Sequence, residues 1–291
     1  MMELDPSIER RHDPDGDAAW EEVWDLDFWS ADASLGGYIR LAVRPGVGRA
    51  TYWACLVGTD RPLVSVIEAE APIPRAPTLE FRTSGLWADI IPQVPFAHMT
   101  VGLEAFGLAF EDPAEVFGRG WGDREALGYD LEWEDEAAPH LPARDGSGHH
   151  SPARVHGEIL VGRDEIDFDG WGTRRHRWGP SESADEMVAA GRLEDGTWFY
   201  VAATGDVHTG YVGDPNARVE PAPSAQRSPD DLLAGARIRL GDLYLAGEPV
   251  HHAPAVDEVS SGRALARRAL VRWSAGDGRA GVGWMEDRSG A

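Results

Sequence analysis

The sequence contains no lysine and a single cysteine. All 27 basic residues are arginines, which excludes a Schiff-base lysine and a phosphate-binding P-loop lysine. Cys55 alone cannot form an intramolecular disulfide or a thiolate cluster for a metal. We expect its thiol to be buried and unreactive on a strand. Because 50 acidic residues give a formal net charge of −23, we expect no nucleic-acid partner.

Long hydrophobic runs are also lacking. No stretch approaches the roughly 18 apolar residues of a membrane-spanning helix, and residues 1–17 lack the apolar region of a secretory signal. The sequence therefore predicts a cytoplasmic protein without a membrane span. It gives no indication of the oligomeric state.

Helical periodicity is weak, and alternating apolar and polar residues indicate β-strands instead. In residues 127–134, Leu127, Tyr129, Leu131 and Trp133 alternate with glycine and acidic residues. This period of two is typical of a strand with one buried face. Further predicted strands cover residues 37–43, 50–57, 62–71, 101–110, 153–162, 164–170, 195–203, 236–246, 270–273 and 281–286. The short helix candidates cover residues 183–191 and 228–235.

Many short strands separated by turn residues predict an all-β protein with antiparallel sheets and few short helices. The chain has 34 glycines and 20 prolines, and it lacks the long crossover helices that a parallel sheet requires. Residues 135–153 are rich in proline, glycine, serine and histidine and are predicted to form a linker. The linker would separate an N-terminal β domain, residues 1–134, from a C-terminal β domain, residues 154–291.

The densest group of polar and aromatic residues lies in residues 166–180. On a strand, Arg174, His176 and Trp178 would share one face, and Arg175 and Arg177 the other. An arginine, a histidine and a tryptophan that face a cavity could bind a polar group, move a proton and cover an apolar ring. Alternatively, Trp178 belongs to the core and His176 is a buried polar group with a structural partner.

This segment resembles the G-x-G-x-R-D-H-S-W-G signature of two-domain lipocalin-like proteins. That family is related to hydroxyneurosporene synthase, a carotenoid hydratase. Lipocalin-like Diels–Alderases have a similar architecture. Residues 151–172 resemble the strand pair that leads into the signature, and residues 85–113 and 277–287 resemble further strands of the family. Two positions depart from the signature, since Arg175 replaces its aspartate and Arg177 its serine. Near Ala97-His98-Met99 an expected acid and tryptophan are also missing.

The resemblance implies two lipocalin-like β-barrel or sandwich domains packed side by side, with a pocket near their interface. It further implies a cofactor-free hydratase or cyclase, or a pericyclase, that acts on a hydrophobic polyene, terpenoid or polyketide in secondary metabolism. The altered positions Arg175 and Arg177 raise the alternative that the protein binds or carries an apolar small molecule without catalysis. A structural partner with a filled barrel is the third hypothesis.

Candidate site residues follow from the signature and from the resembling strands. The candidate catalytic residues are His176, Arg174 and Glu104; a buried Glu104 carboxyl could act as an acid, although pairing with an arginine is the alternative. The candidate ligand-binding residues are Trp87, Asp89, His98, Trp171 and Trp178. We expect no metal site, because the neighbouring histidines of residues 149–150 and 251–252 would point to opposite sides of a strand.

Overall fold

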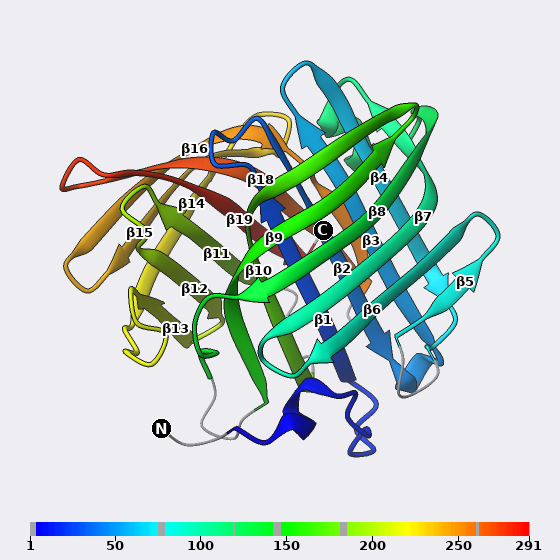
Figure 1. Cartoon of the computed structure of the whole chain (residues 1–291), viewed down its shortest axis with the longest axis horizontal. Coiled ribbons are helices and arrows are strands. Elements are labelled where there is room, and N and C mark those ends of the chain that lie inside the picture. Colours follow the sequence, from blue (N-terminus) through cyan, green and yellow to red (C-terminus); the bar gives the residue numbers. More distant parts are fainter. Residues whose placement is uncertain are drawn as a thin grey trace.

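The computed structural model describes residues 4–74, 79–118, 120–141, 147–180, 185–259 and 262–290. Strands account for 69% of the residues, and the described helical segments are three short 3-10 turns, η1 (Pro6–Glu9), η2 (Pro45–Val47) and η3 (Pro113–Phe117). The strands form two antiparallel sheets that lie side by side (Figure 1). The predicted all-β class with two β domains is therefore confirmed.

The first sheet closes into a ring. Its strand order is β4-β3-β2-β1-β10-β9-β8-β7-β6-β5, and a further pairing of β4 with β7 completes the closure. The strands are β1 (Trp20–Trp29), β2 (Leu35–Arg44), β3 (Arg49–Gly58), β4 (Arg61–Ala71), β5 (Phe81–Thr83), β6 (Leu86–Val94), β7 (His98–Phe110), β8 (Asp123–Asp135), β9 (Gly148–Val161) and β10 (Asp164–Pro180).

The second sheet is a half-barrel. Its strand order is β13-β12-β11-β19-β18-β16-β15-β14, and β17 pairs with β18. The strands are β11 (Glu186–Leu193), β12 (Trp198–Thr204), β13 (Val207–Val212), β14 (Pro221–Arg227), β15 (Leu233–Leu240), β16 (Leu243–His252), β17 (Ala255–Val259), β18 (Gly262–Ala275) and β19 (Ala280–Gly290).

Strand β1 is buried along its whole length because both of its faces are covered. Trp24, Leu26 and Phe28 point into the apolar core of the ring. Trp29 belongs to a second apolar cluster between the two sheets, and this cluster also contains Trp284 of β19. A third cluster fills the half-barrel. The middle cluster holds the two sheets together and surrounds the polar groups described below.

Most of the predicted strands are present, whereas both predicted helices are wrong. Residues 186–191 belong to strand β11, and residues 228–235 form a turn followed by the start of β15. Strand β11 pairs with β12 on one side and β19 on the other, and such pairing overrides weak helical patterning. The predicted strand 236–246 is a hairpin of β15 and β16, in which Gly241 takes a left-handed φ of 58°.

The chain passes from the first sheet to the second at a later position than the predicted linker. Strand β9 begins at Gly148, inside residues 135–153, and β9 and β10 belong to the first sheet; the second sheet starts at Glu186. Local composition does not reveal that β10 pairs with β1 at the other end of the ring. The domain boundary at residues 135–153 stays a prediction. Among the described residues, no helix has the length and apolar character needed to cross a membrane.

Candidate active site between the sheets

A row of charged side chains lines the face of the ring that meets the half-barrel. Strand pairing places Asp25 of β1 opposite Arg175 of β10, and Asp27 opposite Thr173. Since side chains alternate along a strand, these four residues share one face, while Leu26 and its even-numbered neighbours enter the ring. The alternation of aspartate with large apolar residues in β1 thus produces one polar and one apolar face, both buried.

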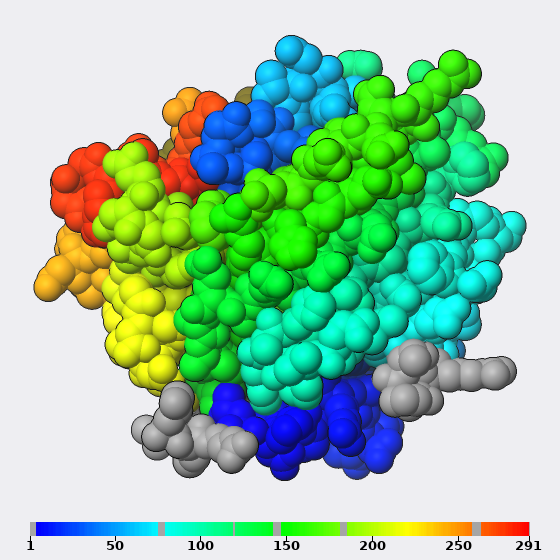
Figure 2. Space-filling view, viewed as in Figure 1, coloured from blue at the N-terminus to red at the C-terminus, as the bar shows by residue number. Residues whose placement is uncertain are grey.

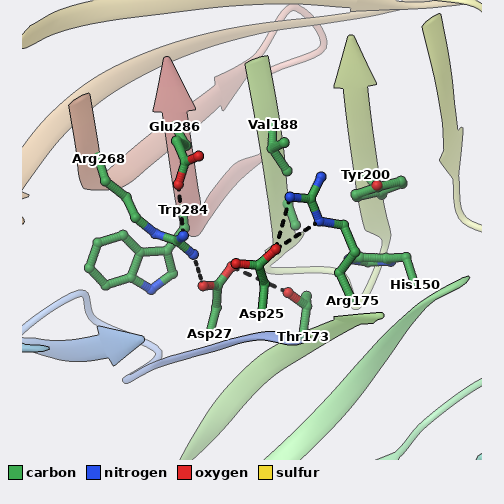
Figure 3. A pocket seen from close by; sticks show the side chains of 11 residues that line it. Asp25, Asp27, His150, Thr173, Arg175, Val188, Tyr200, Arg268, Trp284 and Glu286 are labelled. Atoms are coloured by element: carbon green, nitrogen blue, oxygen red, sulfur yellow. Dashed lines mark hydrogen bonds and ion pairs between the residues drawn. The ribbon is translucent and has the colours of Figure 1, made fainter. Parts of the chain in front are cut away.

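The half-barrel supplies partners for this row. Arg175 Nη2 donates to Asp25 Oδ2 over 2.9 Å, and its Nη1 donates to Glu186 Oε1 of β11 over 2.7 Å. Arg268 of β18 pairs with Asp27, and its Nη1 donates to Glu286 Oε2 of β19 over 2.9 Å. Figure 3 shows Arg268 between Glu286 and Asp27. Two arginines therefore each connect carboxylates from both sheets.

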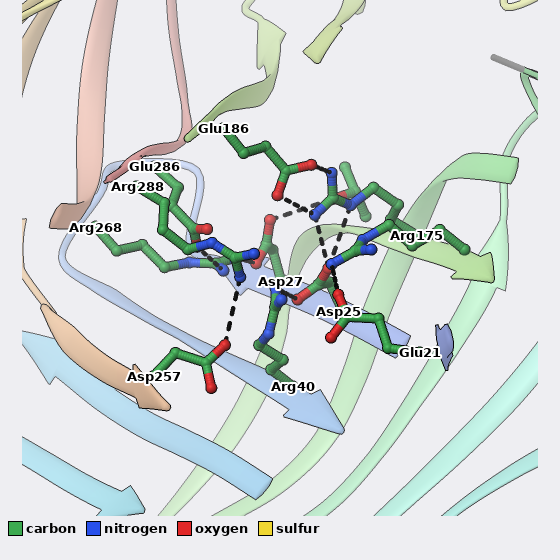
Figure 4. Close-up of polar contacts among 12 residues, drawn as sticks. Glu21, Asp25, Asp27, Arg40, Arg175, Glu186, Asp257, Arg268, Glu286 and Arg288 are labelled. Atoms are coloured by element: carbon green, nitrogen blue, oxygen red, sulfur yellow. Dashed lines mark hydrogen bonds and ion pairs between the residues drawn. The ribbon is translucent and has the colours of Figure 1, made fainter. Parts of the chain in front are cut away.

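Further ion pairs extend this row into an inter-sheet network (Figure 4). Arg40 Nη1 donates to Asp25 Oδ1 over 2.8 Å, and Arg44 Nη2 donates to Asp257 Oδ2 over 2.9 Å. The network pairs six carboxylates with six guanidiniums, namely those of Glu21, Asp25, Asp27, Glu186, Asp257 and Glu286 and those of Arg40, Arg44, Arg175, Arg177, Arg268 and Arg288. The balance of charge allows so many ionised groups to be buried.

Two neighbouring carboxyl groups of this network have opposite protonation tendencies. Burial raises the pKa of Asp27 to about 6; Arg268 opposes this shift, and the negative charge of Asp25 adds to it. Burial would also raise the pKa of Asp25, but the guanidiniums of Arg40 and Arg175 hold it below its usual value. A pair of carboxyls with separated pKa values is the arrangement in which one can act as an acid while the other stays charged.

Asp25 and Asp27 line a small cavity of about 20 Å³ together with His150, Thr173 and Tyr200 (Figure 3). This volume accommodates on the order of one water molecule. Glu286 Oε1, which belongs to another lining residue, is buried and has no hydrogen-bond partner among the described residues. His150 Nε2 is also buried without such a partner. The cavity therefore combines a carboxyl of raised pKa with polar atoms that can accept or donate further hydrogen bonds.

A larger cleft of about 770 Å³ opens further along the same strands. Trp29, Trp171 and Val282 line the cleft, and each lies two residues from a residue that lines the small cavity. Trp273 and Arg192 also line it. The Arg192 guanidinium lies 3.8 Å from the centre of the Trp171 ring. The cleft offers aromatic surface for an apolar molecule close to the polar cavity.

The residues of the sequence signature lie on the other face of β10, at one end of the ring. The Nε2 atom of His176 is 2.9 Å from Glu22 Oε1, and Arg174 Nη1 donates to Glu9 Oε1 over 2.7 Å. The Trp178 ring stacks on that of His12 at 3.7 Å. The shared face of Arg174, His176 and Trp178 is confirmed by these contacts. It faces away from the inter-sheet cavity, which the structure gives to Arg175 instead.

The candidate residues of β6 and β7 lie on the outside of the ring. Trp87, Asp89 and Glu104 line a surface groove of about 320 Å³. Glu104 is exposed, so the burial on which its role as an acid depended is absent. Asp89 accepts a hydrogen bond from the Gly102 amide over 2.8 Å, and burial raises its pKa.

The two remaining candidates occupy further positions. His98 Nε2 lies 2.7 Å from Glu132 Oε2 on the neighbouring strand β8. Trp171 lines the inter-sheet cleft, and the guanidiniums of Arg154 and Arg192 lie 4.7 and 3.8 Å from the centre of its ring. The structure therefore distributes the predicted residues over the ring end, the outer groove and the inter-sheet cleft.

Sequence reasoning did not select Asp27 or Arg268. Aspartates at alternate positions in the otherwise apolar end of β1 were the available signal, because a strand with charge on a buried face needs partners. The sequence offers no comparable signal for the pairing of Asp27 with Arg268, since 241 residues separate them.

Comparison with solved structures identifies the same class of fold. A Nitrosomonas europaea protein provisionally named AttH matches at 14% identity over 97% of this chain and 94% of its own, with a TM-score of 0.65. Kievitone hydratase from Nectria haematococca matches at 8% identity over 97% and 93%, with a TM-score of 0.62. CghA in complex with Sch210972 matches at 8% identity over 94% and 88%, with a TM-score of 0.59. At these identities the likeness shows the fold.

The family follows from the sequence of the whole chain. Residues 5–289 match a family described as a domain of unknown function, DUF7064, and the chain belongs to this family. No curated protein matches the chain. The two-domain β architecture that the resemblance implies is confirmed by the two antiparallel sheets, and the solved structures share this fold.

Proposed function

We propose that this protein is an acid-catalysed hydratase or cyclase that acts on a hydrophobic polyene, terpenoid or polyketide. The observation that carries the proposal is the buried Asp27 carboxyl, whose pKa burial raises to about 6, at a cavity between the two sheets. A carboxyl with a pKa near the working pH can donate a proton and take it back efficiently. The similarity in fold to kievitone hydratase supports the choice of reaction class.

In a hydration, the Asp27 carboxyl would donate its proton to one carbon of an alkene. Water would add to the other carbon and return a proton to the Asp27 carboxylate, so that the acid is regenerated. In a cyclisation, a second double bond of the substrate would attack the cation in place of water, and the new cation would lose a proton to the Asp27 carboxylate, so that the acid is again regenerated. The charged Asp25 carboxylate and the aromatic rings of Tyr200 and Trp284 line the same cavity and would stabilise the positive charge that develops on carbon.

The neighbouring cleft would hold the apolar part of the substrate. Trp171 and Trp273 give it aromatic surface, and burial of such surface is the usual driving force for binding of an apolar ligand. Because the small cavity has room on the order of one water, the proposal requires that Trp29 or Trp284 moves to admit the reacting end of the substrate. This chemistry needs no organic cofactor.

A reaction in D₂O tests the proposal. Compounds extracted from the purified protein are identified by mass spectrometry, and these compounds and a panel of polyenes, terpenoids and polyketides are incubated with the protein in D₂O. We expect a product with one deuterium on carbon, and we expect the Asp27→Asn variant to lose turnover at least about a hundredfold. The matched control is Asp89→Asn, which removes another carboxyl of raised pKa from the outer groove. Full turnover by folded Asp27→Asn would disprove the acid role and would leave a pericyclic reaction, which needs no proton donor.

The second candidate function is non-catalytic binding of an apolar molecule. It is favoured by the packing between the two sheets. The ion pairs there leave a cavity of only about 20 Å³ beside Asp27, whereas the adjacent cleft has a volume of about 770 Å³. A carrier would bind its ligand in the cleft, and Asp27→Asn would not change the product because none is formed. If the protein only binds the ligand, the ligand recovered after incubation in D₂O is chemically unchanged and carries no deuterium. This result distinguishes binding from catalysis.

A further inference from the structure

Three elements bring two histidines and a glutamate together at the end of the ring. His12 lies in the N-terminal segment, residues 4–19, Glu22 lies on β1 and His176 lies on β10. Figures 1 and 2 show this segment, in dark blue, across the lower end of the ring. His12 Nδ1 is 2.8 Å and His176 Nε2 is 2.9 Å from Glu22 Oε1. One donor atom from each of the three residues lies within 4.8 Å of the others.

We propose that His12, Glu22 and His176 bind a divalent transition metal, with zinc as the best match, that attaches the N-terminal segment to the ring. Two imidazole nitrogens and one carboxylate oxygen form a donor set that zinc accepts in proteins. Donor atoms of a tetrahedral zinc site are roughly 3.3–3.6 Å apart, as zinc–donor distances of about 2.0–2.2 Å require. The observed separations therefore need only small side-chain adjustments.

The charge of this ring end supports a cation. Three buried carboxylates lie at this end of the ring, those of Glu9, Glu22 and Asp135. Among the ion pairs of the described residues, the one guanidinium that pairs with any of them is that of Arg174. With neutral imidazoles this gives a formal excess of two negative charges, whereas the inter-sheet network is balanced. A divalent cation would neutralise this excess, and uncompensated charge in a protein interior is costly.

Ring stacking holds the imidazoles in an orientation that suits a metal. The Trp178 ring stacks on His12, and the Trp24 ring stacks on His176 at 4.5 Å. These contacts hold both rings with one nitrogen directed at Glu22, where a metal bound to the three residues would lie. His12 keeps 23% of its side chain exposed, which gives an ion a route to the site.

A further histidine beside the cluster lacks hydrogen-bond partners. His149 is 1% exposed, and its ring centre lies 5.5 Å from that of His176. Neither ring nitrogen has a hydrogen-bond partner among the described residues, although Nε2 is 3.1 Å from Glu9 Oε1. A buried imidazole with unused hydrogen-bonding capacity thus adjoins the proposed ligands.

Metal titration of the full chain tests this proposal. The protein is freed of metal with a chelator and titrated with Zn²⁺, and Co²⁺ serves as a spectroscopic probe. We expect one zinc per chain, visible absorption of the Co²⁺ form at the intensity of a four- or five-coordinate site, and slower proteolysis of residues 4–19 with metal bound. His12→Ala and Glu22→Gln should each weaken Zn²⁺ binding at least about tenfold.

The matched control is His98→Ala. His98 also contacts a glutamate, with 2.7 Å between His98 Nε2 and Glu132 Oε2, but this pair lies elsewhere on the ring. This variant should leave the zinc affinity unchanged. Absence of binding at micromolar zinc, or equal loss in His98→Ala and His12→Ala, would overturn the proposal and leave His12 and His176 as hydrogen-bond partners of Glu22. His12→Ala changes a partly exposed residue, so the test does not depend on whether Glu22→Gln folds.

Discussion

Arg268 on β18 and Asp27 on β1 form an ion pair across the junction of the two sheets, although 241 residues separate them along the chain. The same guanidinium donates to Glu286 on β19. It therefore ties a carboxyl of the ring to a carboxyl of the half-barrel. This contact connects the stability of the junction to the proton affinity of Asp27, and the first two predictions test that connection.

Stability should depend on pH through Asp27. Its pKa is raised from 3.8 to about 6 in the folded protein, so between these pH values the folded state binds more protons than the unfolded state. The free energy of unfolding contributed by Asp27 therefore falls as pH rises from about 4 to 6, by up to about 3 kcal/mol. Urea unfolding at pH 4.5 and 7 measures the free energy of unfolding of the wild type and of Asp27→Asn. The difference in favour of the wild type should be smaller at pH 7 than at pH 4.5. The exposed Asp167→Asn serves as control, and an advantage that grows with pH would contradict the prediction.

Removing Arg268 should strongly destabilise the protein. Arg268→Met leaves two buried carboxylates, those of Asp27 and Glu286, without a shared cation, and breaking a buried pair costs about 3–5 kcal/mol. Chemical unfolding measures the loss. Arg279→Met removes an arginine that pairs with Asp195 and Asp277 at the surface, where such pairs contribute about 0–1 kcal/mol. Equal losses in the two variants would mean that the inter-sheet pair carries no special stability.

His176→Ala tests the catalytic role predicted from the signature. In the structure His176 contacts Glu22 and faces away from the inter-sheet cavity. In metal-free buffer we expect a loss of about 1–3 kcal/mol in stability, because Glu22 loses a partner. Binding of an apolar fluorescent probe per folded molecule should be unchanged. Weaker probe binding by the folded variant would instead place His176 at the ligand, as the sequence pattern predicted.

Limited proteolysis tests the predicted linker. We expect the first cuts within residues 135–153, where composition predicts an exposed segment. Strand β9 pairs with β8 and β10 pairs with β1, so each fragment contributes strands to the same ring. The fragments should therefore stay together in gel filtration and separate only in denaturant. First cleavage within residues 101–110 would contradict the linker, and separation without denaturant would show that the chain divides at the linker despite the shared sheet.

Period-two alternation was sufficient to predict most strands, because each of those strands has one face in an apolar core. It failed at β11, where the small residues Ala189 and Ala190 carry little strand propensity and pairing on both sides decides the conformation. The same alternation correctly predicted that Arg174, His176 and Trp178 share one face of β10. Which face meets the half-barrel depends on how the sheets pack, and the sequence contains no local signal for that.

The position of β1 also affects how the protein folds during synthesis. One edge of β1 pairs with β10, and Asp27 finds its cation in β18. A ribosome that adds roughly 5–20 residues per second reaches Arg268 roughly 10–50 s after Asp27. During that interval Asp27 lacks the guanidinium that pairs with it in the folded protein. Because negative charge on an exposed strand discourages association between chains, the carboxylate that later fills the junction would also help to keep incomplete chains apart.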